Sequence, residues 1–351
     1  MVATSHEHVS AVLRDARFGH GAAPGEPGGP QVSFLRLDPP DHTRLRALVS
    51  RAFTPRMVER LRPRIEAITA ELIGAMGEEA DLVAEFAYPL PVMVITEMLG
   101  VPPEDHERFR GWSEALARGL DPLLPSGQAG TSQRAGLEFR AYFRELLAER
   151  RKRPGEDLLS ALGQVEELTE AELLATCVLL LVAGHETTVN LIANGVLHLA
   201  RHGLLHLASE DPRPVVEEVL RYDPPVQLTA RTALRDAELG GLPLPAGTPV
   251  LALVGSANRD PAAFPDPDRF DPRRFDPRRF TSDRGDPGRH LAFGLGIHFC
   301  LGATLARMEG EIALRALAKA APGLKLAEEA PPYKENVVLR GLAGLPVRLS
   351  A

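Results

Sequence analysis

The chain has 351 residues, of which 44% are hydrophobic and 25% are charged. This balance is typical of a globular protein and excludes a disordered or fibrous chain. The formal net charge of -7 argues against a dedicated nucleic-acid binder, because such proteins usually carry a basic excess or a basic stripe. Length alone does not decide between one large domain and two ordinary ones.

Cysteine usage and the N-terminus indicate a cytoplasmic protein. The two cysteines have different contexts, since Cys177 lies in an apolar run and Cys300 lies between glycines, and we therefore expect no disulfide framework. The N-terminus lacks the basic-then-apolar pattern of a signal peptide. The apolar stretch from Leu173 to Gly184 has about a dozen residues, short of the roughly twenty that a membrane span needs. We expect this stretch to be a buried core helix and expect no membrane association.

The first half of the chain is predicted to be almost wholly helical. A Gly- and Pro-rich loop at residues 19–30 is predicted to be a lid. His42 and Arg46 fall on one face of a predicted helix within residues 38–54, four residues apart. Apolar spacing predicts further helices over residues 6–17, 56–77, 104–119 and 134–152, and one in the 90s that ends at Gly100.

Residues 169–201 are predicted to form the central helix. The segment opens with a capping box, Thr169 to Glu172, and its length of about thirty residues is well beyond the mean for helices. Residues 222–290 are rich in β-branched residues, glycine and proline, which predicts small sheets and a proline-dense coil. A last helix is predicted over residues 302–320, after which the tail returns to strands.

The segment FGLGIHFCLG, residues 293–302, contains Cys300. Its glycines allow a tight loop, and the positive end of the helix that follows would favour a thiolate. This pattern is typical of a ligand position. Three alternatives remain open: a buried structural cysteine, a zinc site with His290 and His298, and a catalytic nucleophile with His298 as its base.

The segment AGHETT, residues 183–188, interrupts the apolar run of the central helix. A glycine, a charge and two threonines lower helix propensity or cost free energy on burial. The Thr187 hydroxyl is spaced to bond the carbonyl of Ala183 and to open the helix locally. This indicates room for a diatomic ligand beside a cofactor, with Glu186 as a buried proton donor. The alternative is a helix that simply leaves the core at His185.

A third motif, EEVLRYDPP, places Glu218 and Arg221 three residues apart on one helix face. On its own, this spacing predicts no more than a solvated ion pair.

Together and in this order, the motifs resemble those of the cytochromes P-450. Residues Phe293, Gly294, Gly296, His298, Cys300 and Gly302 look like the family's haem-binding signature. The resemblance implies a mainly α fold, the P-450 prism with small accessory β-sheets, as a single haem-thiolate domain over residues 1–351. It also implies that the chain is N-terminally short, because family members usually begin with some tens of residues before a segment like residues 2–13.

The resemblance further implies a role for each motif. The cofactor would be haem b, with Cys300 as its axial thiolate. The other cofactor-binding residues would be Ala183, Phe293, Gly294 and Gly302, with the propionate partners His42, Arg46, Arg231 and His298. Glu186 and Thr187 would be the catalytic acid–alcohol pair. Glu218, Arg221 and Arg269 would form a structural triad.

The implied activity is that of a monooxygenase that hydroxylates or epoxidises a hydrophobic small molecule with dioxygen and two electrons. No Gly-rich dinucleotide fingerprint follows a strand, so the electrons would come from a separate ferredoxin and its NAD(P)H-dependent reductase. The donor would dock on a face that bears Arg46, Arg51, Arg289 and Arg307. The alternatives are a haem-binding protein without hydroxylase activity and a peroxide-driven oxygenase.

The substrate pocket is predicted to be largely apolar, which indicates a hydrophobic guest without identifying it. Besides Ala183, its walls would include Leu179, Val182, Gln227, Leu228, Thr229, Val337 and Val338.

Overall fold

The computed structural model describes residues 1–21, 33–119, 126–276 and 290–349. Most of the predicted lid at residues 19–30, and Arg289, lie outside the described residues. The helices are α1 (His6–Arg14), α2 (Asp41–Ala52), α3 (Pro55–Ala75), α4 (Pro89–Met98), α5 (His106–Arg118), α6 (Ser126–Lys152), α7 (Leu158–Gly163), α8 (Glu170–His202), α9 (Leu205–Glu210), α10 (Pro212–Tyr222), α11 (Val254–Ala257) and α12 (Ala303–Ala320). The predicted helices are confirmed, with end shifts of a few residues in most cases.

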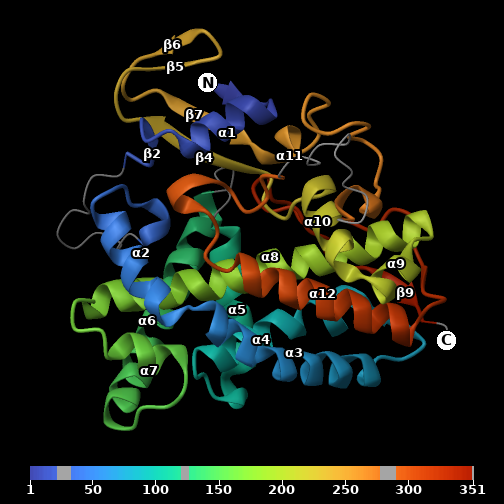
Figure 1. Ribbon diagram of the computed structural model, residues 1–351. Coiled ribbons are helices and arrows are strands. Elements are labelled where there is room, and N and C mark those ends of the chain that lie inside the picture. The colour runs from blue at the N-terminus through green and yellow to red at the C-terminus, as the bar shows by residue number, and fades with distance from the viewer. Residues whose placement is uncertain (22–32, 120–125, 277–289, 350–351) are drawn as a thin grey trace.

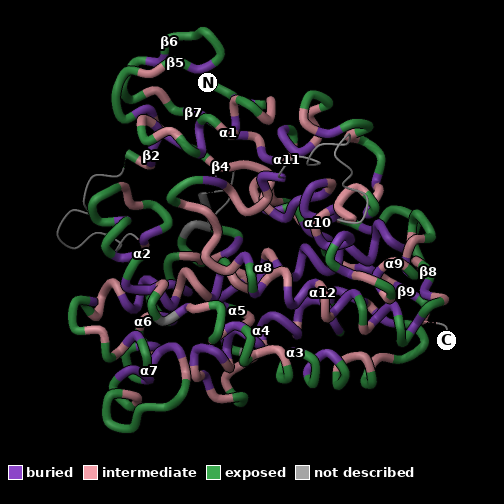
Figure 2. Tube along the Cα trace, viewed as in Figure 1, coloured by how far each residue is buried: buried purple, intermediate pink, exposed green. Residues whose placement is uncertain are grey.

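Helix α8 lies at the centre of the fold (Figure 1). The Thr169 hydroxyl accepts the N–H of Glu172, and the Glu172 carboxylate accepts the N–H of Thr169, so the predicted capping box is confirmed. The helix ends at Gly203, which has φ +65°. It packs against α4, α5, α6, α10 and α12, and Figure 2 shows most of its length buried.

Within the described residues, α8 is also the one helix long and apolar enough to cross a membrane by composition. Its most apolar window is 67% buried inside the protein, because neighbouring helices cover it. The prediction of a core helix is therefore confirmed.

Small sheets flank the helices, as predicted for the second half of the chain. A four-stranded sheet has the order β1-β7-β4-β2, a three-stranded sheet has the order β3-β9-β8, and β5 and β6 form a pair. Strand β1 pairs parallel to β7, and β4 pairs antiparallel to β7. The strands are β1 (Val2–Ala3), β2 (Phe18–Gly19), β3 (Glu79–Asp81), β4 (Leu228–Ala233), β5 (Ala237–Leu239), β6 (Leu242–Leu244), β7 (Pro249–Leu253), β8 (Lys325–Leu326) and β9 (Pro346–Arg348).

Two large hydrophobic clusters hold these elements together. One surrounds α8 and includes residues of the helices packed on it, and the other lies between α1 and the four-stranded sheet. The segment that leads to Cys300 touches both, because Leu291 and Leu295 are buried in the smaller cluster whereas Phe293 and Leu301 pack against the larger one. Burial on two sides therefore fixes the position of the Cys300 loop.

Candidate functional site

The loop around Cys300 is shaped by backbone hydrogen bonds and two glycines. The Cys300 N–H donates to the Phe293 carbonyl at 2.9 Å, which closes the loop. Gly294 has φ +67° and Gly296 has φ +69°, a region that side chains disfavour. A Cβ on Gly296 would also lie 2.5 Å from the carbonyl oxygen of Leu13. Glycine is therefore required at the point where this loop crosses α1.

Burial and nearby positive groups have opposing effects on the pKa of the Cys300 thiol. Burial raises its pKa, while the Gly302 N–H and the positive charges of Arg46 and Arg307 act to lower it. Helix α12 begins at Ala303, as predicted, so the cysteine lies just before the positive end of that helix.

Three histidine rings gather beside this loop. The ring centroids of His42 and His298 are 4.2 Å apart, and those of His20 and His298 are 4.9 Å apart. Both ring nitrogens of His42, and Nε2 of His20 and of His298, are buried without a hydrogen-bond partner in the described part of the chain. Such unpartnered groups are costly unless a ligand satisfies them. The sequence analysis did not identify His20.

Burial and positive neighbours keep these imidazoles neutral, while two arginines supply positive charge. Burial lowers the pKa of His298 to about 3 and that of His20 to about 4, with Arg231 adding to both effects. Arg231 is buried and donates to the Thr229 hydroxyl at 3.0 Å. Arg46 donates to the Phe299 carbonyl next to Cys300. The predicted propionate partners are thus brought together around one point.

Helix α8 presents an uncovered apolar face. Ala183 is exposed, and Leu179 and Thr187, one turn to either side, are half-buried, although the helix is otherwise largely buried. The Thr187 hydroxyl donates to the Ala183 carbonyl at 2.7 Å, as predicted. The predicted opening of the helix is wrong, because residues 170–202 are helical throughout. The hydroxyl bond adds to the helix without breaking it.

Glu186 is buried and has a cationic partner. Its carboxylate accepts from the Lys334 ammonium at 2.6 Å, and it lies 3.6 Å from Nε2 of His185. The Glu186 side chain is 6% exposed, whereas that of Lys334 is 31% exposed, so the pair connects the interior with the surface. The sequence analysis missed Lys334, which is 148 residues away along the chain.

These residues fit a flat, largely apolar cofactor with acidic substituents. The exposed face of α8 offers apolar contact, and the imidazoles and arginines offer donors for carboxylates. Cys300 lies among them as a soft ligand suited to iron.

Comparison with known proteins decides the family. Residues 213–319 match the model of the family described as Cytochrome P450. The chain is 44% identical to cytochrome P450 CYP107DY1 of Priestia megaterium, covering 90% of this chain and 76% of that protein. It is 43% identical to 6-deoxyerythronolide B hydroxylase of Saccharopolyspora erythraea, covering 89% of this chain and 76% of the relative. The chain belongs to the cytochrome P450 family.

Solved structures confirm the fold of this P450 as the predicted mainly α prism. The structure of CYP164A2 from Mycobacterium smegmatis matches with a TM-score of 0.89 and 44% identity, over 99% of this chain and 90% of that one. The structure of P450BioI in complex with an acyl carrier protein matches with the same TM-score at 37% identity, over 99% and 91%. The chain is therefore a haem-dependent monooxygenase, with a family role in secondary metabolism.

The predicted structural triad of this P450 requires a correction. The guanidinium of Arg221 donates twice to Glu218, at 2.7 and 2.8 Å, and both side chains are fully buried. The Arg269 side chain is 70% exposed and contributes only its backbone carbonyl to Arg221. Arg274 takes the predicted place, with Nε 3.5 Å from Glu218. Arg269 turns outward because the next residue, Phe270, turns into the core.

The residues predicted to line one substrate pocket lie in several different environments. Val182 and Val338 join a small apolar cluster with Ala117 and Leu339, while Leu179 packs on the main core. Leu228 and Thr229 are half-buried on β4, and Val337 is 40% exposed.

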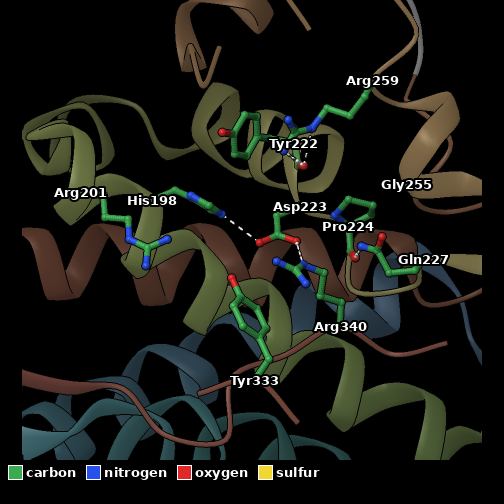
Figure 3. Close-up of a pocket in the computed structure, with 10 residues that line it drawn as sticks. All are labelled: His198, Arg201, Tyr222, Asp223, Pro224, Gln227, Gly255, Arg259, Tyr333 and Arg340. Carbon is green, nitrogen blue, oxygen red and sulfur yellow. Dashed lines mark hydrogen bonds and ion pairs between the residues drawn. The ribbon is translucent and has the colours of Figure 1, made fainter. Parts of the chain in front are cut away.

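Gln227 does not fit the predicted apolar wall. Its amide donates to the Pro224 carbonyl at 2.7 Å, and it lines a separate polar cavity (Figure 3). Its neighbour Val226 packs against the apolar cluster instead, because successive residues of an extended chain point to opposite sides.

The zinc alternative lacks support in the structure. His290 bonds to Glu217 at 3.0 Å, and Arg307 donates to the same carboxylate at 2.6 Å. Burial would raise the pKa of Glu217, but these two partners hold it at about 2. No group of three metal-ligating side chains is found in the residues that the structure describes.

Two further features were not foreseen. Arg307, predicted to meet a redox partner, is held by Glu217 and lies 4.4 Å from the centre of the Phe293 ring. Glu309 on α12 is buried, which raises its pKa to about 8, although a hydrogen bond to Thr188 acts to lower it. Only the helical spacing of Glu309 relative to Leu305 and Ala313, four residues to either side and both buried, could have placed it near the core.

Proposed function

We propose that Cys300 would hold the iron of a haem b through its thiolate and that this P450 hydroxylates or epoxidises a hydrophobic small molecule. The observation that carries this proposal is the set of unpartnered histidine nitrogens beside Arg46 and Arg231, next to the Cys300 loop. When bound, the haem supplies the dioxygen activation, which a thiolate ligand favours.

The residues around the loop would orient the haem by its propionates. His42 and His298 are neutral, so each offers one N–H donor, and Arg46 and Arg231 offer charged donors. Charge-assisted bonds of this kind are about twice as strong as neutral ones. Phe293, Gly294, Gly302 and Ala183 would contact the cofactor.

Glu186 and Thr187 would hold and transfer the protons that the reaction uses. Lys334 holds the Glu186 carboxylate at 2.6 Å and is itself in contact with solvent, so a proton can be exchanged at this carboxylate. The Thr187 hydroxyl already donates to Ala183, so its oxygen is available as an acceptor for a proton-bearing water or substrate.

We further propose a single domain over residues 1–351, a cytoplasmic location, and a ferredoxin with its NAD(P)H-dependent reductase as electron donors. Relatives named for 6-deoxyerythronolide B and mycinamicin IV support a hydrophobic natural product as the substrate class. Among the arginines of the predicted docking face that the structure describes, Arg307 pairs with Glu217 and Arg46 is half-buried, whereas Arg51 is exposed. Reversal of its charge in Arg51→Glu should slow reduction by ferredoxin, and an unchanged rate would count against this face.

The carbon-monoxide difference spectrum of the reduced protein tests the ligand assignment. Wild-type protein should show the strongly red-shifted Soret band of a haem-thiolate, and Cys300→Ala should lose that band. A histidine-type band in the wild type would contradict ligation by Cys300. It would favour a haem protein without hydroxylase activity.

A further inference from the structure

A polar cavity of about 390 Å³ lies at the ends of α8 and α10, where the C-terminal loop crosses them (Figure 3). This volume is in the range of small-molecule sites. The lining residues are His198, Arg201, Tyr222, Asp223, Pro224, Gln227, Gly255, Arg259, Tyr333 and Arg340. Neither the haem site nor the proton pair uses the charged groups of this wall.

Positive charge is in excess in this cavity. The wall holds three arginines and one acid, Asp223. That carboxylate is already shared, because it accepts from Arg340 Nε at 2.8 Å and bonds His198 Nε2 at 2.9 Å. An incoming ligand would therefore meet little free negative charge.

The three arginines differ in the partners that their guanidinium groups already have. Arg259 has an acidic partner of its own, since it pairs with Asp268 at 2.8 Å and also donates to the Tyr222 carbonyl at the end of α10. Arg201 donates from Nη2 to a neutral carbonyl, that of Glu329, which leaves its charge unbalanced there. Arg340 donates to Asp223 through Nε and also bonds the Tyr333 side chain, and its side chain is 43% exposed, so further N–H groups remain open to another acceptor.

Aromatic surfaces complete the wall. The guanidinium of Arg340 lies 4.0 Å from the centre of the Tyr333 ring, and the rings of His198 and Tyr222 are 4.9 Å apart. Figure 3 shows the Tyr333 hydroxyl on the side of the cavity where Arg201 and Arg340 approach Asp223. These rings are already in contact with protein side chains, so a ligand would meet the N–H groups of the arginines and not a free aromatic face.

A two-stranded ribbon separates this cavity from the predicted substrate pocket. The Arg340 N–H donates to the Pro225 carbonyl at 2.8 Å, and the Gln227 N–H donates to the Val338 carbonyl at 2.8 Å. Gln227 and Arg340 face the cavity, whereas Val226 and Leu339 pack with Val182 on the other side. The cavity is thus a second site, not an extension of the first.

We propose that this cavity binds a small organic carboxylate, whose carboxylate group is held by Arg201 and Arg340. The site lies outside the predicted substrate pocket, so its ligand is neither the substrate nor the cofactor of the monooxygenase reaction.

Calorimetric titration of the haem-loaded protein with benzoate tests this site. A haem-binding azole present at saturation keeps benzoate out of the haem pocket. One equivalent of benzoate should bind, and the neutral isostere benzamide should not. Arg201→Gln should weaken binding by about tenfold through loss of one charge-assisted contact. The matched control Arg235→Gln, an exposed arginine in the turn between β4 and β5, should leave binding unchanged.

Each other outcome would overturn the proposal. Equal affinity in wild type and Arg201→Gln would place the ligand elsewhere, and loss of binding in the presence of the azole would place it in the haem pocket. Equal binding of inorganic phosphate would indicate a site for anions in general and not for organic carboxylates. None of these readouts depends on catalysis, so failure here is distinct from failure of the proposed monooxygenase function.

Discussion

Two buried polar regions of this P450 differ in how their hydrogen bonds are satisfied. Around Arg221, all five guanidinium N–H groups have acceptors within the chain, two on Glu218 and three on backbone carbonyls. Around His42, buried ring nitrogens have no acceptor or donor in the described residues. A closed network, in which every donor has an acceptor, stabilises the fold, whereas unpartnered polar atoms are suited to binding a ligand. Hydrogen-bond satisfaction therefore separates structural residues from binding residues, which the sequence motifs do not distinguish.

Glu218→Ala should have the largest effect, because it leaves the fully buried charge of Arg221 uncompensated. We expect a loss of about 3–5 kcal/mol in the free energy of unfolding. His42→Leu breaks no bond within the chain and should change that free energy by less than about 1 kcal/mol, while haem is lost faster. Urea unfolding followed by circular dichroism measures the first effect, and haem transfer to a scavenging apoglobin measures the second. Equal destabilisation by both changes would remove the distinction between the two regions.

Thr187→Ala should reduce coupled product formation by about a hundredfold, because a positioned proton-transfer group contributes on that scale. Consumption of NAD(P)H should continue. The matched control is Thr176→Ala, which removes the same bond to the carbonyl four residues earlier on α8 but lies away from the uncovered face. The measurement is product formed per electron pair. Full coupling in Thr187→Ala would exclude the proton role.

Glu309→Gln should change how stability depends on pH. Burial raises the pKa of Glu309 from 4.5 to about 8, so between these values the folded protein holds a proton that the unfolded chain releases. Stability therefore falls as pH rises through this window, by about 1.4 kcal/mol per pH unit for this group. The variant should lose this slope. Unfolding midpoints at several pH values test the effect, and parallel profiles for variant and wild type would contradict it.

Arg274→Ala should have the smallest measurable effect, a loss of about 1–2 kcal/mol from the closed network. Arg269→Ala should stay within about 0.5 kcal/mol, since the Arg269 side chain is largely exposed. Thermal unfolding of the two variants compares them directly. A larger effect at Arg269 would restore the triad that the motif predicted.

Local patterns predicted much of this molecule. The capping box at Thr169, the bond from Thr187 to Ala183 and the turn around Gly294 each depend on residues a few positions apart. At such short separations, the geometry of the helix or of the loop largely determines which residues are in contact. For the same reason, the length and burial of α8 could be predicted from its composition.

Contacts between distant segments could not be predicted. No pattern in the sequence around Glu186 indicates that Lys334 will pair with it. The proline-rich segment offers several arginines at similar spacing. In the folded chain Phe270 is buried and Arg269 is exposed, whereas Arg274 lies beside Glu218 and donates to the Pro265 and Asp266 carbonyls.

The amino-acid sequence by itself determined the helices, the Cys300 loop and the family, because those features depend on short-range geometry and on motif order. The tertiary structure alone decided the cationic partner of Glu186, the third member of the Glu218 network, the approach of His20 to His298 and the cavity beside Asp223. These depend on which surfaces the two hydrophobic clusters bring together, and the free energy of that packing is spread over many residues far apart in the chain.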